Sequence, residues 1–515
     1  MSTAGRETAL LAVGSPGGPW FGPRVFDDAA RCPAKAAVAL RGYDLPTGSR
    51  PEPLAKLTGG AWLAAACLLR ELGSRGPTSA YPAGQHPVTD LGRLAASVLP
   101  REGRPVREFG VAAAEALLDA QAVTAGAFDY YPAFIKMPFG SGEMHAGGAF
   151  AFRGPAGEWQ IWRLRMMTAH PACDVSRGWA MTAAYCLAGH LDRERQDPLR
   201  AVAAFELGAT RGPVEHIGSW TRAELDTEFA ALRAGTLRNM AMDLRVKAGS
   251  HCAGCTFVGH CPAAPRIEGL LQLVPPQPTV RKITATDLRM HAGCARRYQL
   301  LSLHGLPGEE LTGEALLRGQ SLDAWLCGNH MRGAACAEAD VHRFLVETAD
   351  EQGAAMARRH LGICPLADPD TSRGTLVAQT DVAALDAGSR VLLVARPDTI
   401  YQRARTIVWR ETKTRTTLTP RTAQRLVETE IAAALYLTLL ASGASGPPNA
   451  LEWEELAADG HELTVLPIDD KDLVEAARAC VSATVADLLS DSTFPPRIGA
   501  GCAGCAARPW CPDAP

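Results

Sequence analysis

The sequence has no long apolar run and no recognisable export signal. None of its apolar stretches approaches the roughly 18–20 residues needed to span a bilayer, and the first residues lack a basic segment followed by an apolar one. No Gly-x4-Gly-Lys-Ser/Thr segment is present either, which excludes a P-loop motor in this chain. We therefore expect a cytoplasmic protein without membrane contact, and any ATP-driven motor acting with it must be a separate partner.

An excess of charge of either sign is also missing. The 515 residues include 52 Lys and Arg against 55 Asp and Glu, a formal net charge of −3. This balance excludes a protein that is basic over its whole surface, so any nucleic-acid surface must be local. The length is too great for one hydrophobic core and predicts two domains of ordinary size.

Cysteine, by contrast, is abundant, with 15 residues. Without an export signal, this number indicates metal ligation rather than disulfides. The pattern Cys-x2-Cys-x5-Cys occurs twice, with one further cysteine far upstream of each triplet. The two groups are Cys32 with Cys252, Cys255 and Cys261, and Cys294 with Cys502, Cys505 and Cys511. Four thiolates suffice for a zinc or an iron–sulfur site.

The other seven cysteines, Cys336 and Cys364 among them, show no ligand spacing, and we expect most to be buried as small apolar residues.

Further landmarks repeat in the same order and predict a tandem duplication, with two unrelated domains as the alternative. Trp162 aligns with Trp409, and a helical stretch carrying a tyrosine follows each, with Tyr185 and Tyr436 at similar distances from the next triplet. The Pro-rich stretch after the first triplet is a natural linker. The predicted domains are 1–262, a linker at 263–280, and 281–515.

Candidate chemistry lies in the second half, in the stretch VLLVARPDTIYQRARTIVWRETKTR. Its apolar runs predict two strands joined by a polar turn through 402–405, with Asp398 ending the first strand. Glu411 and Lys413, two apart at the end of the second strand, should face the same way. Two carboxylates can hold a hard divalent cation, and a neighbouring lysine can orient or activate a water. The three residues form a minimal hydrolytic site for a phosphodiester.

Pro397–Asp398 followed by Glu411-Thr-Lys413 resembles the PD-(D/E)xK nuclease signature. ITATDLRMHAGCARRYQLL, with Cys294 before Tyr298, resembles the opening helix of RecB-like and CRISPR-adaptation-type nucleases. DSTFPPRIGAGCAGCAARPWCP resembles their closing segment. The resemblance covers about residues 281–515, and the first half more faintly.

The resemblance implies an α/β fold of two tandem restriction-endonuclease-like domains, each a central mixed sheet flanked by helices and stapled by a four-cysteine site. It favours a 4Fe–4S cluster over zinc in each site, and it implies Mg²⁺ or Mn²⁺ at Asp398 and Glu411.

The second half departs from the family pattern where many members carry a metal-binding histidine. Asp323, four residues after Gly319, can substitute as an oxygen ligand or be a solvated helix residue. His330 and His342 are further candidates, with surface histidines as the alternative. Tyr436 is either a DNA-contacting residue or part of helix packing.

The first half has lost the site. Leu164 and Met166 occupy the positions of Glu411 and Lys413, and apolar side chains cannot ligate a cation. We expect this copy to be catalytically dead and kept for DNA binding or for an interface.

Basic residues surround the predicted site, and only Asp398 and Glu411 are acidic in the same stretch. They are Arg396, Arg403, Arg405, Arg410, Lys413, Arg415, Arg421 and Arg425. This composition favours a phosphate backbone, with Arg396, Arg410 and Arg415 expected to contact DNA. A basic face without a partner is the alternative.

The sequence therefore predicts a metal-dependent deoxyribonuclease with iron–sulfur clusters, acting in DNA repair, recombination or anti-phage defence. Single-stranded or end-containing DNA is the favoured substrate, and a helicase or complex subunit is an expected partner. The alternative is a non-catalytic tandem iron–sulfur or zinc protein that binds DNA or serves as a scaffold.

Overall fold

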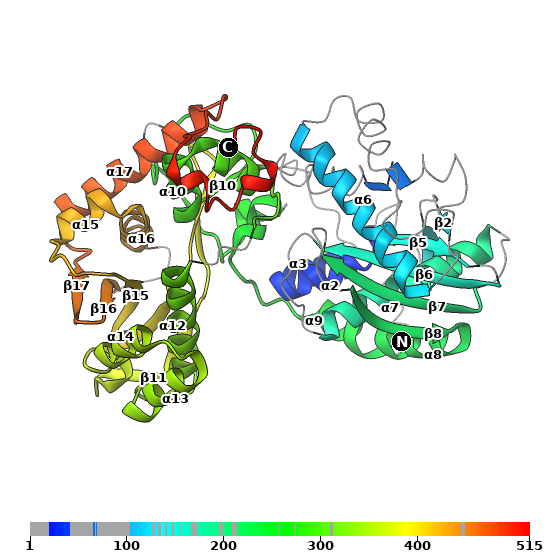
Figure 1. Cartoon of the computed structure of the whole chain (residues 1–515), viewed down its shortest axis with the longest axis horizontal. Coiled ribbons are helices and arrows are strands. Elements are labelled where there is room, and N and C mark those ends of the chain that lie inside the picture. Colours follow the sequence, from blue (N-terminus) through cyan, green and yellow to red (C-terminus); the bar gives the residue numbers. More distant parts are fainter. Residues whose placement is uncertain are drawn as a thin grey trace, which may run out of the picture. The chain divides into compact units, whose positions relative to one another are not determined.

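The structure is a computed structural model. It describes residues 20–41, 65–66, 68–69, 104–125, 129–131, 135–139, 142–146, 149–154, 156–165, 173–194, 199–208, 214–255, 257–272, 274–309, 313–443 and 449–514. The chain divides into two compact units (Figure 1). The first comprises Met1–Lys247, Leu300–Gly308 and Pro509–Pro512, and the second Ala248–Gln299, Glu309–Arg508 and Asp513–Pro515.

A five-stranded sheet forms the centre of the first unit. Its order is β2 (Asp129–Tyr131), β5 (Ala149–Arg153), β6 (Glu158–Arg165), β7 (Ala201–Gly208) and β8 (Val214–Thr221). A smaller sheet has the order β1 (Trp20–Phe21), β4 (Gly142–His145) and β3 (Lys136–Phe139). The helices are α2 (Arg24–Arg31), α3 (Pro33–Arg41), α6 (Arg104–Ala125), α7 (Cys173–Arg193), α8 (Arg222–Leu232), the π-helix η2 (Arg233–Leu237) and α9 (Arg238–Met242).

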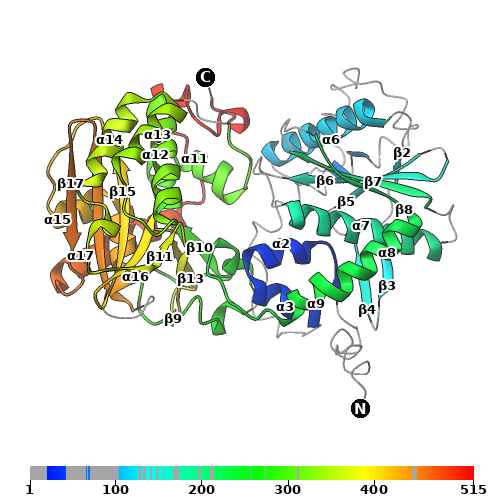
Figure 2. The same cartoon turned by 90° about the horizontal axis from the view of Figure 1, so that it is seen from below.

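The large sheet of the first unit is covered on both faces. Alternation along β6 sends Trp159 and Ile161 into one core with α7, while Trp162 packs into a second core with α6. Figure 2 shows α6 and α7 on opposite sides of this sheet. The unit is therefore a three-layer α/β/α arrangement, because a sheet that is apolar on both faces must be buried on both.

The second unit contains two sheets. The larger has the order β11 (Thr371–Ala378), β14 (Thr399–Arg403), β15 (Thr406–Thr414), β16 (Asn449–Ala457) and β17 (Gly460–Leu466). The smaller has the order β10 (Arg281–Thr284), β13 (Val391–Ala395), β12 (Val382–Asp386) and β9 (Arg266–Ile267).

Helices of the second half follow in chain order. They are η3 (Ser250–Gly254), η4 (Val258–His260), α10 (Ala285–Gly293), α11 (Ala295–Tyr298), η5 (Gln299–Leu303), α12 (Glu314–His330), α13 (Glu338–Thr348), α14 (Glu351–Leu361), η6 (Pro365–Ala367), α15 (Ala423–Thr429), α16 (Ile431–Ala441), α17 (Lys471–Ser490), η7 (Ala500–Cys502) and η8 (Arg508–Trp510). A capping box between Thr284 and Asp287 fixes the start of α10, and the Asp350 side chain caps α14.

The two five-stranded sheets share one pairing scheme. In each, the first three strands pair antiparallel, the third and fourth pair parallel, and the fifth returns antiparallel. A buried Arg–Glu pair joins the third and fourth strands at corresponding registers, Arg163 with Glu206 and Arg410 with Glu452. The mixed α/β class expected from the sequence is confirmed.

Two details differ from the sequence expectation. The stretch 263–280, expected to be a linker, contributes β9, which pairs with β12. A Pro-rich segment can do so at a sheet edge, and here the carbonyls of Pro265 and Ile267 accept from the amides of Leu385 and Ala387. The prediction that the VLLVA strand precedes the catalytic strand directly is wrong. That strand is β13 of the smaller sheet. The hairpin partner of β15 is β14, whose last two residues, 402–403, fall in the turn expected at 402–405.

Among the helices that the structure describes, none has the length and apolar character needed to cross a membrane.

Candidate active site

The β14–β15 hairpin brings Asp398, Glu411 and Lys413 together. Thr399 pairs with Arg410, so Asp398, one residue earlier, lies opposite the Glu411 end of β15. Oδ2 of Asp398 accepts a 2.8 Å hydrogen bond from the amide of Thr412. Glu411 and Lys413 flank that residue on one face of β15, and the Lys413 ammonium donates to Oε1 of Glu411. Backbone pairing thus fixes the two carboxylates and the ammonium beside one another.

The electrostatics of these residues suit a bound cation. Glu411 is only 5% exposed, and its buried Oε2 has no hydrogen-bond partner among the described residues. Burial, together with repulsion from Glu411, raises the pKa of Asp398 to about 7, although Lys413 and the Thr412 amide oppose the rise. A buried carboxylate oxygen without a partner and two mutually repelling carboxylates fit the oxygen ligands that Mg²⁺ or Mn²⁺ takes.

Asp323 reaches the same place from α12. The side-chain amide of Gln379 donates to Oδ1 of Asp323 at 3.0 Å and to Oδ1 of Asp398 at 3.3 Å. Gln379 follows β11 in a left-handed conformation, with φ of 52°, and its backbone amide donates to the Asp398 carbonyl. The sequence pointed to Asp323 but not to Gln379, since a glutamine after a strand carries no motif.

Tyr436 lies in the interior of the second unit, on α16. Its hydroxyl donates to the Arg396 carbonyl at 3.1 Å, and its ring meets Trp409 edge-on at 6.0 Å. Burial and the neighbouring carboxylates Glu411 and Asp398 raise its pKa. This position fits helix packing beside the carboxylates, the alternative to a DNA contact.

Arg410 points to the opposite face of β15. It is 2% exposed, and its Nε and Nη2 donate to Oε2 of Glu452 at 2.9 Å and 2.6 Å. Its Nη1 donates to the Ile363 carbonyl. A phosphate cannot reach so buried a guanidinium, so the expectation that Arg410 contacts DNA does not fit the structure.

The rest of the basic stretch is also paired. The side chain of Arg396 is exposed and forms an ion pair with Asp381. Arg415 forms ion pairs with Glu430 and Glu455. Of the eight basic residues, all but Arg405 pair with a carboxylate among the described residues. The local positive charge is therefore smaller than the sequence composition indicated.

The C-terminal cysteines lie where the opening helix meets the closing segment. The Arg497 amide donates to Sγ of Cys294 at 3.4 Å, and Sγ of Cys502 donates to the Arg497 carbonyl at 3.8 Å. His291 and Asp491 join the same segments at 3.0 Å. A pocket of about 440 Å³ opens beside Cys294.

The backbone around the cysteines repeats between the halves. Cys32 and Cys294 each stand directly after a helix and have an extended backbone. The backbone amide of each donates to the carbonyl four residues earlier, at 2.7 Å for Cys32 and 2.8 Å for Cys294. Each triplet begins with a turn in which the backbone amide of the second cysteine donates to the carbonyl of the first. The distance is 3.0 Å from Cys255 to Cys252 and 3.3 Å from Cys505 to Cys502.

In the first half, Leu164 lies on β6 and packs against the α6 core. Met166, expected at the lysine position, lies outside the described residues. His342 is exposed, and His330 is buried elsewhere, beside three other ligand-type side chains.

Residues 282–512 match the family model of the PD-(D/E)XK nuclease superfamily. The second half of the chain is therefore similar to this superfamily over these residues. The match spans the opening helix α10, the hairpin that carries Asp398 and Glu411, and the C-terminal cysteines. The resemblance inferred from the motifs is confirmed at this level.

No curated protein matches the chain. Among solved structures, a putative exonuclease from Eubacterium rectale is 14% identical, with coverage of 41% of this chain and 80% of its own and a TM-score of 0.28. The protein SSO0001 is also 14% identical, with coverage of 46% and 88% and a TM-score of 0.21. At such scores neither likeness bears on the fold.

Proposed function

We propose that the second half is a Mg²⁺- or Mn²⁺-dependent deoxyribonuclease. The observation that carries the proposal is the convergence of Asp398, Glu411 and Lys413 on the β14–β15 hairpin of a superfamily domain. Asp398 and Glu411, with Asp323 from α12, would hold the cation. The buried Oε2 of Glu411, for which the described part of the chain offers no hydrogen-bond partner, is available to it. When bound, a divalent ion neutralises phosphate charge and lowers the pKa of water.

The chain's own groups do the positioning. The Thr412 amide orients Asp398, and the ammonium of Lys413, held by Glu411, can orient a water and offset charge that develops on the phosphate. The buried Tyr436 and Trp409 limit solvent behind the carboxylates, which strengthens each electrostatic interaction. Together these groups suit phosphodiester hydrolysis.

We further propose that the chain is a tandem duplication with an inactive first copy. The shared strand pairing, the matching Arg–Glu pairs and the repeated cysteine turns support a common origin. Leu164 in place of a carboxylate supports the loss of catalysis in the first half. On their spacing and the family resemblance, the two cysteine groups, Cys32 with the first triplet and Cys294 with the second, would each hold a 4Fe–4S cluster.

On the RecB-like resemblance, we place the activity in DNA repair, recombination or anti-phage defence, with single-stranded or end-containing DNA as substrate and a separate helicase or complex subunit as partner.

Cleavage by the purified full-length protein tests the proposal. Single-stranded DNA, double-stranded DNA and RNA are incubated with Mg²⁺, Mn²⁺ or EDTA, and products are separated on denaturing gels. We expect DNA cleavage that requires a divalent ion. Absence of cleavage with every substrate and ion would favour a non-catalytic binding or scaffold role.

A further inference from the structure

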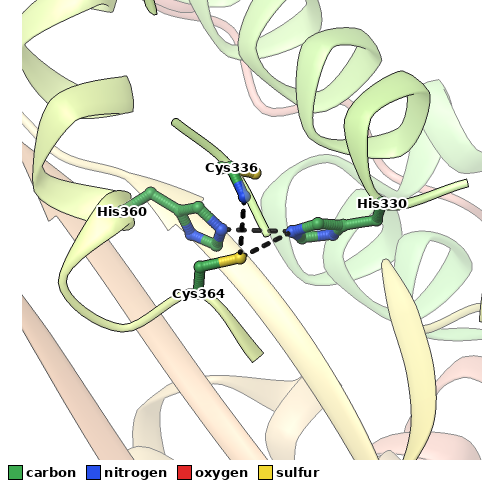
Figure 3. Close-up of side chains that lie close together, drawn as sticks. All are labelled: His330, Cys336, His360 and Cys364. Carbon is green, nitrogen blue, oxygen red and sulfur yellow. Dashed lines mark hydrogen bonds between the residues drawn. The ribbon is translucent and has the colours of Figure 1, made fainter. Parts of the chain in front are cut away.

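A second set of metal-ligand side chains lies in the second unit, on the α12–α14 side of the large sheet. His330, Cys336, His360 and Cys364 are all buried, and their ligand atoms all lie within 4.8 Å of one another (Figure 3). His330 ends α12, Cys336 lies in the loop before α13, His360 is near the end of α14, and Cys364 precedes η6. No residue of the nuclease site belongs to this group.

The distances between the ligand atoms suit one tetrahedral ion. Nε2 of His330 lies 3.2 Å from Nε2 of His360 and 3.7 Å from Sγ of Cys364. For zinc bonded to nitrogen at about 2.0–2.1 Å and to sulfur at about 2.3 Å, tetrahedral geometry places two nitrogens about 3.3 Å apart and a nitrogen and a sulfur about 3.6 Å apart. His330, His360 and Cys364 are therefore already spaced as ligands, and the ligand atom of Cys336 lies within 4.8 Å of theirs.

The surroundings orient two of the ligands. Nδ1 of His360 contacts Oε1 of the buried Glu454 at 2.6 Å, which leaves the Nε2 lone pair directed at the cluster. The amide of Cys336 donates to Sγ of Cys364 at 3.5 Å, a contact that stabilises a thiolate. Tyr401, Val408, Leu366 and Leu376 form an apolar shell with the two cysteines.

We propose that His330, Cys336, His360 and Cys364 bind one structural zinc ion. Two thiolates and two imidazoles are the donor set of closed zinc sites, and four ligand atoms within 4.8 Å of one another suit a single ion rather than a cluster. The ion ties α12 and α14 together beneath the large sheet. It also reaches the nuclease site, since Glu454 accepts from Thr412 Oγ1 at 3.2 Å and the Thr412 amide holds Asp398. The zinc assignment does not depend on nuclease activity.

Metal counting by inductively coupled plasma mass spectrometry tests the site in full-length protein produced with added zinc. Cys364→Ser should lose one zinc per chain relative to wild type. The matched control, Cys480→Ser on α17, changes a half-buried cysteine outside the group and should lose none. Comparison with wild type removes any contribution from metal in the two cysteine triplets. Equal zinc in folded wild-type and Cys364→Ser protein would overturn the proposal.

A second variant decides the question if Cys364→Ser does not fold. His330→Cys keeps four ligands, so it should keep the ion and, after cobalt substitution, show stronger thiolate-to-cobalt absorption than wild type. An unchanged cobalt spectrum would refute ligation by His330. A wild-type protein that holds no zinc and carries a Cys336–Cys364 disulfide under reducing purification would also refute the site.

Discussion

The amide of Thr412 donates a 2.8 Å hydrogen bond to the carboxylate of Asp398, and this contact sets the register of the candidate active site. Thr412 stands between Glu411 and Lys413, so the bond that holds Asp398 also fixes its position relative to both. On the other face of the strand, the Thr412 hydroxyl donates to Glu454, the partner of His360. One residue thus connects the proposed nuclease site to the proposed zinc site.

Stability in EDTA should depend on the protonation of Asp398. Its folded-state pKa of about 7 exceeds the ordinary value of 3.8, so the folded state binds more protons between these values and stability falls as pH rises through that window. Asp398→Asn removes this loss and should stabilise the metal-free protein at pH 8 by a few kcal/mol, at ~1.4 kcal/mol per pKa unit. Thermal melts of wild type and Asp398→Asn in EDTA from pH 4 to 8 measure this difference. If the Tm of the variant does not rise relative to that of wild type as the pH rises, the expectation is contradicted.

Asp323 should contribute to cation affinity. Gln379 bridges it to Asp398, and removing one of three carboxylates weakens a hard-cation site. Asp323→Ala should raise the Mg²⁺ concentration for half-maximal cleavage by about tenfold, in line with ~1.4 kcal/mol for a lost ligand. Glu314→Ala, an exposed carboxylate on the same helix, is the control. An identical Mg²⁺ dependence in the two variants would assign Asp323 to a solvated helix face.

Arg410 should matter for folding and not for DNA affinity. Arg410→Met leaves the buried Glu452 without its closest cation, although Arg403 and Tyr401 still contact that carboxylate. Breaking such a pair typically costs about 3–5 kcal/mol. Urea unfolding measures the loss, and the exposed Arg405→Ala should change stability by less than about 0.5 kcal/mol. A variant as stable as wild type would show that the pair is dispensable.

The cysteine groups should hold iron. Anaerobically purified protein should contain about eight irons per chain if two 4Fe–4S clusters fill, and Cys502→Ser should remove about half of them. Cys480→Ser should keep the full content. Colourless protein with zinc in place of iron would refute the cluster assignment but leave the four-cysteine groups intact.

The sequence located the candidate catalytic trio because the spacing of Glu411 and Lys413 on one strand defines their shared face. It did not reveal β14, since the short stretch TIYQR between a buried strand and a turn lacks a clear alternation. Asp398 was therefore assigned to the end of the wrong strand, although its position opposite Glu411 is unaffected.

The basic stretch shows a second limit. Within 396–425 the sequence offers only two carboxylates, but the fold brings in Glu452 and Glu455 from β16, which pairs with β15. Such partners lie tens of residues away in the chain, so composition within a window cannot reveal them. The positive charge that the sequence of this stretch offers to a phosphate backbone is therefore largely neutralised by carboxylates in the fold.

The buried His and Cys group shows a third limit. The sequence indicates that Cys336 and Cys364 are small buried residues without ligand spacing. Both are buried, but His330 and His360 lie beside them. The spacings His-x5-Cys and His-x3-Cys could have indicated a pair of ligand segments. They went unrecognised because each segment mixes residue types, unlike a Cys-x-x-Cys turn.

The central claim is that Asp398 and Lys413 perform metal-dependent hydrolysis, and the most direct measurement is single-turnover DNA cleavage by matched full-length variants. Asp398→Ala and Lys413→Ala should each lower the rate by at least about 100-fold in Mg²⁺, the loss expected for a positioned electrostatic group. Lys471→Ala, an exposed lysine at the start of α17, should cleave as wild type does. Circular dichroism and thermal melts should show that all three variants fold. Cleavage at the wild-type rate by folded Asp398→Ala and Lys413→Ala would contradict the assignment of this site.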